Sequence, residues 1–294
     1  MNSKWDSHIH LFTDDMAKHP QAWGDSHKEF IWKACVAPPD RLSIQGWADI
    51  NQLLKDMDRG GIEKAILLGW YWENMETCRL HNRFYAELIR KHPDRLLAFA
   101  SIQPMGQDAL EEITRTKDEG FSGIGEIHPQ AQRFSLRDKC WQKILEHICD
   151  WNIPVNLHVT DPDSKNHPGK IETPLGDYVE MADDWPNQTF ILAHLGGLLP
   201  LRDKSKDLKT TFKNVYFDCA AIPLLYESAV LPEVADRIGC EKILFGTDYP
   251  LITFPREQKQ PGFVRSIEFV RGSGLTASQL ELVFSTNAKR LFSV

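Results

Sequence analysis

Eight short segments rich in apolar and β-branched residues recur along this chain of 294 residues, with stretches of helical periodicity between them. Strands that alternate with helices form parallel sheets, because each helix returns the chain to the edge where the next strand begins. We expect strands at residues 5–11, 64–69, 96–102, 123–127, 154–159, 189–194, 215–219 and 242–246. Eight such units predict a single-domain α/β protein, residues 1–294, folded as a (β/α)8 TIM barrel.

The segments between the expected strands support this prediction. Residues 49–59 place several apolar side chains on one helical face. Glycines follow three of the helix-like segments, at Gly61, Gly120 and Gly239, where the left-handed conformation that ends many helices favours this residue. No glycine-rich phosphate-binding loop follows the first strand, which argues against a dinucleotide-binding fold.

A long loop insertion, residues 12–48, separates the first expected strand from its helix and contains Trp23, Trp32 and Trp47. In a barrel, this connection leaves the carboxyl end of a strand, at the face where active sites are built. The segment could close over a site as a lid, or it could pack against the barrel with no other role. The sequence favours neither alternative.

The charge balance and the N-terminus limit the classes of partner. The chain has 41 acidic and 34 basic residues, a formal net charge of −7 that disfavours nucleic acid. No secretory signal is evident, and no apolar run approaches the roughly 20 residues that span a bilayer. Six scattered cysteines form no CxxC pair and are expected to be reduced. We therefore expect a cytoplasmic protein that binds a small-molecule substrate and no membrane, and the sequence leaves a homo-oligomer open.

The pair His8 and His10 is the most specific local pattern. Residues two apart in a strand point to the same side, so both imidazoles can face the barrel axis and converge on one metal ion. Such a pair alone is weak evidence for a metal site, because buried or surface histidines at this spacing are common.

Four further polar residues end other expected strands, in otherwise apolar surroundings. They are Glu126 on the fourth strand, His158 on the fifth, His194 on the sixth and Asp248 on the eighth. Barrel active sites are assembled from the carboxyl ends of several strands. Six potential metal ligands on five strand ends therefore predict a metal site, and His128 is a further pocket candidate beside Glu126.

These residues resemble the motifs of the amidohydrolase superfamily, in particular its amidohydrolase-2-like branch. The resemblance rests on His8 and His10, on His158 and His194, on the Gly-Thr-Asp-Tyr-Pro run at residues 246–250 and on the closing segment 287–292. It extends over nearly the full length and is specific for the superfamily, but it does not identify a substrate.

The resemblance implies a role for each residue. His8, His10 and Asp248 match ligands of a buried metal, and His158 matches the fifth-strand ligand. The sixth-strand residue, His194, binds a second metal or assists catalysis in such proteins. Glu126 occupies the position where many members carry a carboxylated lysine that bridges two metals, so the number of ions, one or two, stays open.

The ligand set suggests a first hypothesis about the chemistry. Mixed nitrogen and oxygen ligands suit zinc best, although manganese or iron would also fit. A divalent ion makes bound water acidic, with Asp248 as general base and His194 stabilising the oxyanion. The sequence therefore favours a metal-dependent hydrolase acting on a C–O or C–N bond, such as that of a lactone or amide.

Three alternatives stay open. The first is a metal-dependent decarboxylase of a small unsaturated or aromatic acid, an activity also found in the amidohydrolase-2-like branch. The second is a nuclease of the TatD-like type, which resembles this chain around Glu126 but fits its acidic composition poorly. The third is a barrel that binds a ligand without catalysis.

Substrate contacts are harder to predict. Aromatic residues after the second strand and in the 12–48 insertion could stack on a flat substrate or only pack loop against barrel: Trp70, Tyr71, Trp72, Trp23 and Trp32. One of four basic residues could bind a substrate carboxylate: Arg133, Lys165, Lys170 or Arg202. We expect most of the remaining histidines to be surface or lid residues: His19, His27, His81, His92, His147 and His167.

Overall fold

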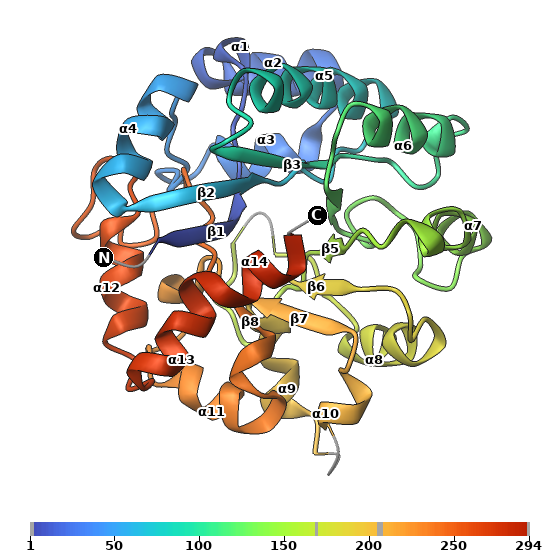
Figure 1. Cartoon of the computed structure of the whole chain (residues 1–294). Coiled ribbons are helices and arrows are strands. Elements are labelled where there is room, and N and C mark those ends of the chain that lie inside the picture. Colours follow the sequence, from blue (N-terminus) through green and yellow to red (C-terminus); the bar gives the residue numbers. More distant parts are fainter. Residues whose placement is uncertain (1–2, 168–169, 205–207, 293–294) are drawn as a thin grey trace.

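In the computed structural model, residues 3–167, 170–204 and 208–292 are described. Eight parallel strands follow one another in sequence order around a barrel, and helices surround them (Figure 1). The strands are β1 (Lys4–Ile9), β2 (Ile62–Leu67), β3 (Leu96–Ala100), β4 (Gly123–Ile127), β5 (Val155–Leu157), β6 (Phe190–Leu192), β7 (Val215–Asp218) and β8 (Ile243–Leu244). The expected (β/α)8 barrel is confirmed.

Helices connect the strands and cover their outer faces. The first seven are α1 (Asp14–Lys18), α2 (Pro20–His27), α3 (Phe30–Val36), α4 (Ile50–Gly60), α5 (Met75–Lys91), α6 (Ala109–Asp118) and α7 (Lys139–Ile148). The others are α8 (Leu175–Asp184), α9 (Leu199–Arg202), α10 (Leu208–Thr211), α11 (Val230–Ile238), α12 (Val264–Arg271), α13 (Ala277–Glu281) and α14 (Asn287–Phe292). None of the helices in the described ranges is long and apolar enough to cross a membrane.

Helix α4 illustrates how the sequence determines an element. The Asp49 side chain accepts a hydrogen bond from the Gln52 amide at 2.7 Å and caps the helix start. Leu53 and Met57 are fully buried against the barrel, as the apolar spacing predicts. Gly61 ends the helix at φ +64°, a conformation in which a Cβ would be strained.

The barrel closes through the segment that follows β8. The Asp248 amide donates a hydrogen bond to the His8 carbonyl at 2.8 Å, and Tyr249 pairs with Ile9 as a parallel bridge. Because of this closure, the residues after β8 lie directly beside the end of β1. The eighth-strand aspartate and the histidine pair therefore reach the same point.

Two apolar layers hold the barrel together. The larger lies between the strands and the surrounding helices, and a smaller cluster including Trp5 and Phe99 fills the barrel interior. Ala288 and Phe292 of α14 join this inner cluster, and α14 lies across that end of the barrel (Figure 1). Burial of one such aromatic side chain contributes about 1.5–3 kcal/mol. With this end packed, ligands can enter only from the other.

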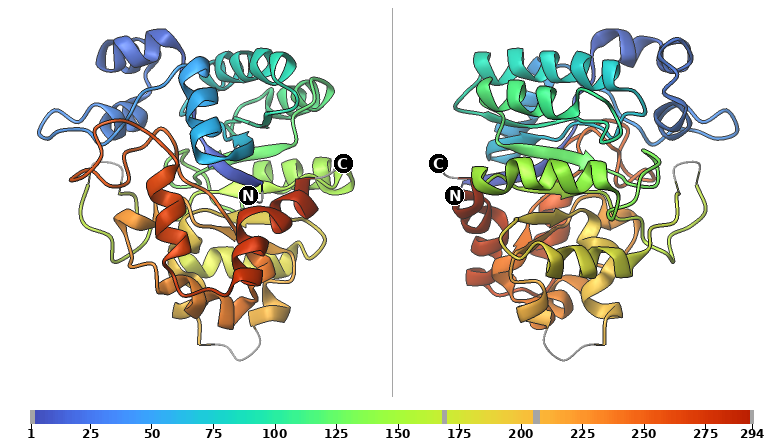
Figure 2. Two further views of the ribbon diagram at one scale, coloured as in Figure 1. Left: turned by 60° about the vertical axis from the view of Figure 1, so that its left-hand side comes forward. Right: turned by 90° about the vertical axis from the view of Figure 1, so that its right-hand side faces the viewer.

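The 12–48 insertion is more ordered than expected. It contains α1, α2 and α3, and its residues Trp23 and Trp32 are buried in a cluster with Phe12 and Trp72. Most of the insertion is thus packing, while residues 38 and 41–45 line a cavity at the barrel mouth. The loops after β1 and β5 project on the side away from the termini (Figure 2). The packing alternative thus holds for most of the segment, and a lid role for the part that lines the cavity stays a prediction.

His81 is the exception among the six remaining histidines, most of which were expected at the surface or in a lid, because it is a core residue. Its ring is fully buried: Nδ1 accepts a hydrogen bond from Trp72 Nε1 at 3.0 Å, and Nε2 donates to the Leu11 carbonyl at 2.8 Å. The bond from Trp72 requires the neutral ring, because a protonated Nδ1 could not accept it. Burial lowers the pKa of His81 to about 3.

This histidine makes stability depend on pH. The unfolded chain takes up a proton near pH 6.5, whereas the folded protein does not until about pH 3, so acid favours unfolding. We expect the free energy of unfolding to fall by up to about 1.4 kcal/mol per pH unit through this window on account of His81. Urea unfolding of wild type and His81→Gln across this range checks it. Equal pH slopes for the two proteins would contradict the assignment.

Candidate active site

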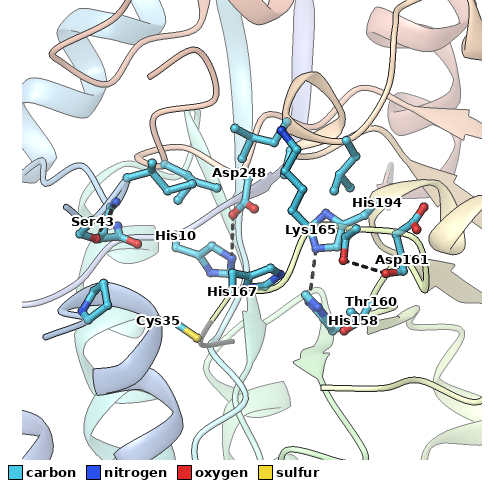
Figure 3. Close-up of a pocket in the computed structure, with 18 of the residues that line it drawn as sticks. His10, Cys35, Ser43, His158, Thr160, Asp161, Lys165, His167, His194 and Asp248 are labelled. Carbon is cyan, nitrogen blue, oxygen red and sulfur yellow. Dashed lines mark hydrogen bonds and ion pairs between the residues drawn. The ribbon is translucent and has the colours of Figure 1, made fainter. Parts of the chain in front are cut away.

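The six predicted metal ligands lie together at the mouth end of the barrel. His8 belongs to β1 and Glu126 to β4, whereas the other four follow the ends of β1, β5, β6 and β8. His10, His158, His194 and Asp248 point toward a common centre (Figure 3). The backbone turns sharply at two of them, with φ of +58° at His194 and +65° at Asp248. Such strained positions outside glycine are typical of functional sites.

The inner half of the cluster surrounds the histidine pair. His8 Nε2 and His10 Nε2 are 3.2 Å apart. Oε2 of Glu126 lies 3.8 Å from the first and 3.7 Å from the second. Oδ1 of Asp248 lies 3.8 Å and 3.4 Å from the same two atoms. The histidine pair is almost completely shielded from solvent.

The outer half of the cluster uses the other oxygen of Glu126. Oε1 lies 2.7 Å from His158 Nδ1 and 3.7 Å from His194 Nε2. These two ring nitrogens are 3.2 Å apart. One carboxylate thus faces two histidine pairs, and ligand atoms of each group of three lie within 4.8 Å of one another.

Three of the histidines are held in one tautomer by partners outside the cluster. The Nδ1 atoms of His8, His10 and His194 each lie 2.9 Å from a fixed acceptor. These acceptors are the Asp218 carboxylate, the Leu68 carbonyl and the Ala220 carbonyl, respectively. Each ring therefore donates its Nδ1–H outward and turns the lone pair of Nε2 toward the cluster, as metal-binding histidines do.

This arrangement fits a divalent metal ion. Two lone pairs directed at each other at 3.2 Å repel unless a cation or a proton lies between them. Burial opposes a positive charge on His8, yet the carboxylates of Asp218 and Glu126 outweigh it and raise its pKa to about 10. The cluster thus favours positive charge strongly, as a cation site must.

Asp218 is the main residue that the sequence analysis missed. Its buried carboxylate accepts hydrogen bonds from the His8 ring, the backbone amides of His194 and Ala220, and the Asn156 side chain. Burial opposes ionisation of Asp218, but the charge and the hydrogen bond of His8 outweigh it and keep the pKa of this carboxylate below its usual value. Asp218 ends β7, and the strand-end criterion that found the other carboxylates would also have selected it.

The cluster opens into a cavity of ≈ 430 Å³ at the barrel mouth. Glu126 belongs to its lining, as do His158, His194 and Asp248, which are seen around the centre of the cavity (Figure 3). Among the predicted substrate contacts, Trp70, Tyr71 and Lys165 line its walls. So does His167, an exposed residue of the loop after β5, in agreement with its expected surface position.

The remaining candidates lie elsewhere. Trp72 packs in the aromatic cluster, Arg133 is exposed and pairs with Glu73, and Lys170 donates to the Pro162 and Ser164 carbonyls. Arg202 pairs with two aspartates behind the cavity wall. The other histidines besides His81 are exposed or partly buried at the surface, as expected: His19, His27, His92 and His147.

His128 lies behind the cavity and does not line it. It is fully buried, and its ring stacks on His158 with centroids 4.7 Å apart and an interplanar angle of 15°. Burial and the neighbouring His158 hold its pKa well below the usual value, so the ring is neutral. His128 therefore supports the His158 ring and is not part of the ligand cluster.

The family comparison covers almost the whole chain, because a model described as amidohydrolase matches residues 5–294. Among characterised proteins, the chain is 25% identical over 292 residues to a gamma-resorcylate decarboxylase of Rhizobium sp. (strain MTP-10005). That similarity covers 82% of this chain and 86% of the relative.

Several solved structures of similar fold are named decarboxylases, and others are named amidohydrolases. A 2,6-dihydroxybenzoate decarboxylase with bound 2,6-dihydroxybenzoate has a TM-score of 0.70 at 21% identity, covering 100% of both chains. A 5-carboxyvanillate decarboxylase of Sphingomonas paucimobilis has a TM-score of 0.74 at 15% identity, covering 99% of both. A dihydroxybenzoic acid decarboxylase of Polaromonas sp. JS666, with bound manganese and an inhibitor, has a TM-score of 0.71 at 20% identity, covering 99% of this chain and 97% of that one.

These similarities overturn the hydrolase hypothesis. The expectation of lactone or amide hydrolysis rested on the ligand set alone, which hydrolases and decarboxylases of this branch share. The relative with a named activity is a decarboxylase of an aromatic acid, which favours the alternative. Zinc was likewise inferred from ligand types, whereas the named metal in a similar structure is manganese. By its family match over residues 5–294, the chain is a member of the amidohydrolase-2 family of enzymes.

Proposed function

We propose that this enzyme is a metal-dependent decarboxylase of a small aromatic acid that carries a ring hydroxyl. The observation that carries this proposal is a buried cluster of four histidines and two carboxylates at the base of a cavity with an aromatic wall. The similarity to a gamma-resorcylate decarboxylase selects this chemistry over the others that such a cluster could perform.

The cavity suits a flat ring. Trp70 and Tyr71 stack on each other with centroids 4.4 Å apart and form one wall. Leu224, Leu225 and Leu251 contribute apolar surface to the lining. A volume of ≈ 430 Å³ accepts a substituted benzene ring with room to spare, and aromatic side chains favour such a ligand by offset or edge contacts.

A divalent ion would be held by His8, His10 and Asp248, with Glu126 and His158 available to the same ion or to a second one. In this proposal His194 stays free of the metal, so that its Nε2 can carry a proton. When bound, it would supply positive charge that orients the substrate carboxylate and hydroxyl at the cavity base. Manganese is the first ion to test, and zinc or iron would fit the same mixed ligands.

In the reaction, the bond between the ring carbon and the carboxyl group breaks and carbon dioxide leaves. The electron pair stays on the ring carbon, which takes a proton in exchange. We assign the proton to His194, because its Nδ1–H is fixed on the Ala220 carbonyl and Nε2 faces the cluster. Although burial opposes it, the hydrogen bond and charge of Glu126 raise the pKa of His194.

Asp248 has the complementary role in this proposal. Burial would favour its neutral form, but the His10 hydrogen bond and the charge of His8 outweigh this and lower its pKa to about 2. A carboxylate that stays ionised can accept a hydrogen bond from the substrate's ring hydroxyl and raise the electron density at the ring carbon. No water molecule is consumed, in contrast to hydrolysis.

Product analysis tests the proposal. Manganese-loaded protein is incubated with a panel of hydroxybenzoic acids, lactones and amides, and both carbon dioxide and organic products are quantified. We expect equal amounts of carbon dioxide and the corresponding phenol from at least one hydroxy acid, and none from protein treated with a chelator. Turnover of lactones or amides with no carbon dioxide from any acid would overturn it.

A further inference from the structure

The segment that follows β5 forms one wall of the cavity. Residues 159–161 and 164–167 line it, and Thr160, Lys165 and His167 are seen around the opening (Figure 3). This segment begins directly after His158, and the cavity that it lines is also lined by Glu126, His194 and Asp248 of the cluster. A ligand in this cavity can therefore contact both the wall and the cluster.

Asp161 fastens the wall to two neighbouring loops. Its carboxylate is buried and accepts hydrogen bonds from the Tyr226 hydroxyl, beyond β7, and from Arg202 Nη2 at 3.3 Å and 3.4 Å. Arg202 in turn donates from Nε to the Gly197 carbonyl at 2.8 Å, just beyond β6. One carboxylate thus connects the loops after β5, β6 and β7, and the wall is held in place before any ligand binds.

One charge on this wall lacks a partner. Glu126 and Asp248 are committed to the cluster, and Asp161 is paired with Arg202, which also pairs with the exposed Asp163 outside the cavity lining. Lys165 lines the cavity with no hydrogen-bond or ion-pair partner anywhere in residues 3–167, 170–204 and 208–292. An ammonium group without a protein partner, on a cavity wall, is available to a ligand anion.

We propose that Lys165 is a specificity-determining residue that binds a second anionic group of the substrate, distinct from the carboxyl group that is lost. The substrate class is then an aromatic acid with a further carboxylate on the ring. This inference rests on the proposed function for the identity of the reaction, but the binding preference can be measured without turnover.

The test uses two acids that lack the ring hydroxyl and bind without reacting, benzoate and isophthalate. Their affinities for manganese-loaded protein are measured by calorimetry at low ionic strength. We expect isophthalate to bind about 10-fold more tightly than benzoate, as one added charge-assisted contact allows. In Lys165→Met the ratio of the two affinities should fall to within about 3-fold, while the affinity for benzoate stays unchanged. The control variant Lys55→Met, at an exposed site on α4, should show the wild-type ratio.

A second variant tests whether the hydrogen bonds of Asp161 hold this wall of the cavity in position. Tyr226→Phe removes the hydroxyl that contacts Asp161, and we expect it to reduce the isophthalate preference while leaving manganese content and benzoate affinity unchanged. Tyr216→Phe, on β7 and away from the cavity, is the matched control. A purely structural role for Asp161 would lower the unfolding midpoint without changing the ratio of the two affinities.

Equal binding of the two acids by wild type, or an undiminished preference in Lys165→Met, would overturn the proposal. Failure of the proposed function has a different signature. In that case no hydroxy acid releases carbon dioxide, yet the preference for isophthalate over benzoate and its dependence on Lys165 would still be measured.

Discussion

Replacing His194 by asparagine is expected to lower kcat for decarboxylation by about 10²–10⁴-fold, the usual contribution of a positioned proton donor. The asparagine amide can still donate to the Ala220 carbonyl, which His194 Nδ1 approaches at 2.9 Å, so the backbone after β6 should keep its path. It offers no proton to the ring carbon. The variant therefore separates proton transfer from folding.

Because His194 also lies 3.7 Å from Glu126, metal content must be measured in the same samples. Rates are then compared per metal-loaded chain, with the exposed His147→Asn as the control. A loss of less than about 10-fold at full metal content would remove His194 from the proposed proton transfer.

Replacing Asp218 is expected to have the largest effect outside the ligand set. Asp218→Ala would leave the donors of His8, His194 and Ala220 buried without an acceptor, at about 1–3 kcal/mol each, although these costs do not add fully. We expect a loss of several kcal/mol in the free energy of unfolding, measured with urea.

The conservative variant Asp218→Asn tests orientation rather than packing. When the asparagine amide group faces His8, Nδ1 of His8 must accept a hydrogen bond from it. The ring proton then moves to Nε2 and occupies the lone pair that would bind the metal. We expect manganese affinity to fall by about 10–100-fold in a folded protein. Asp183→Asn, on the exposed side of α8, is the control. Wild-type affinity in Asp218→Asn would show that the carboxylate does not select the tautomer of His8.

Periodicity and strand-end chemistry were sufficient to predict the barrel and the six residues that cluster at its mouth, while their role as metal ligands stays a prediction. Some of the expected strands, however, extend beyond the ends of the observed strands. Residues 154–159 and 189–194 were expected as strands, whereas β5 is Val155–Leu157 and β6 is Phe190–Leu192. The apolar pattern continues past these strands because the following residues are also buried, but the backbone leaves the sheet to direct His158 and His194 into the cluster.

Other features depend on contacts between distant parts of the chain. His81 looks like a surface residue of an amphipathic helix in the sequence, because its hydrogen-bond partners, Trp72 and Leu11, come from other parts of the chain. In the sequence, Lys165 and Arg202 were equivalent candidates to bind a substrate carboxylate. The structure distinguishes them, because the loops after β5 and β6 bring Arg202 to Asp161, whereas Lys165 lines the cavity.

The choice between hydrolysis and decarboxylation could not be made from the ligands, since both reactions use the same cluster. The choice depends on which group reaches the reacting carbon atom, and this is determined by the substrate and by the cavity that holds it. The similarity to an aromatic acid decarboxylase supplied what the six ligand residues could not.

The most direct test of non-hydrolytic decarboxylation follows a hydroxybenzoic acid labelled with carbon-13 in its carboxyl group, in deuterated water with manganese-loaded protein. We expect NMR to show all of the label lost as carbon dioxide or bicarbonate and one deuterium on the ring carbon that carried it. Both changes should disappear when the metal is removed or His194 is replaced. A label that stays on the organic product, or leaves without deuterium at that carbon, would contradict the account.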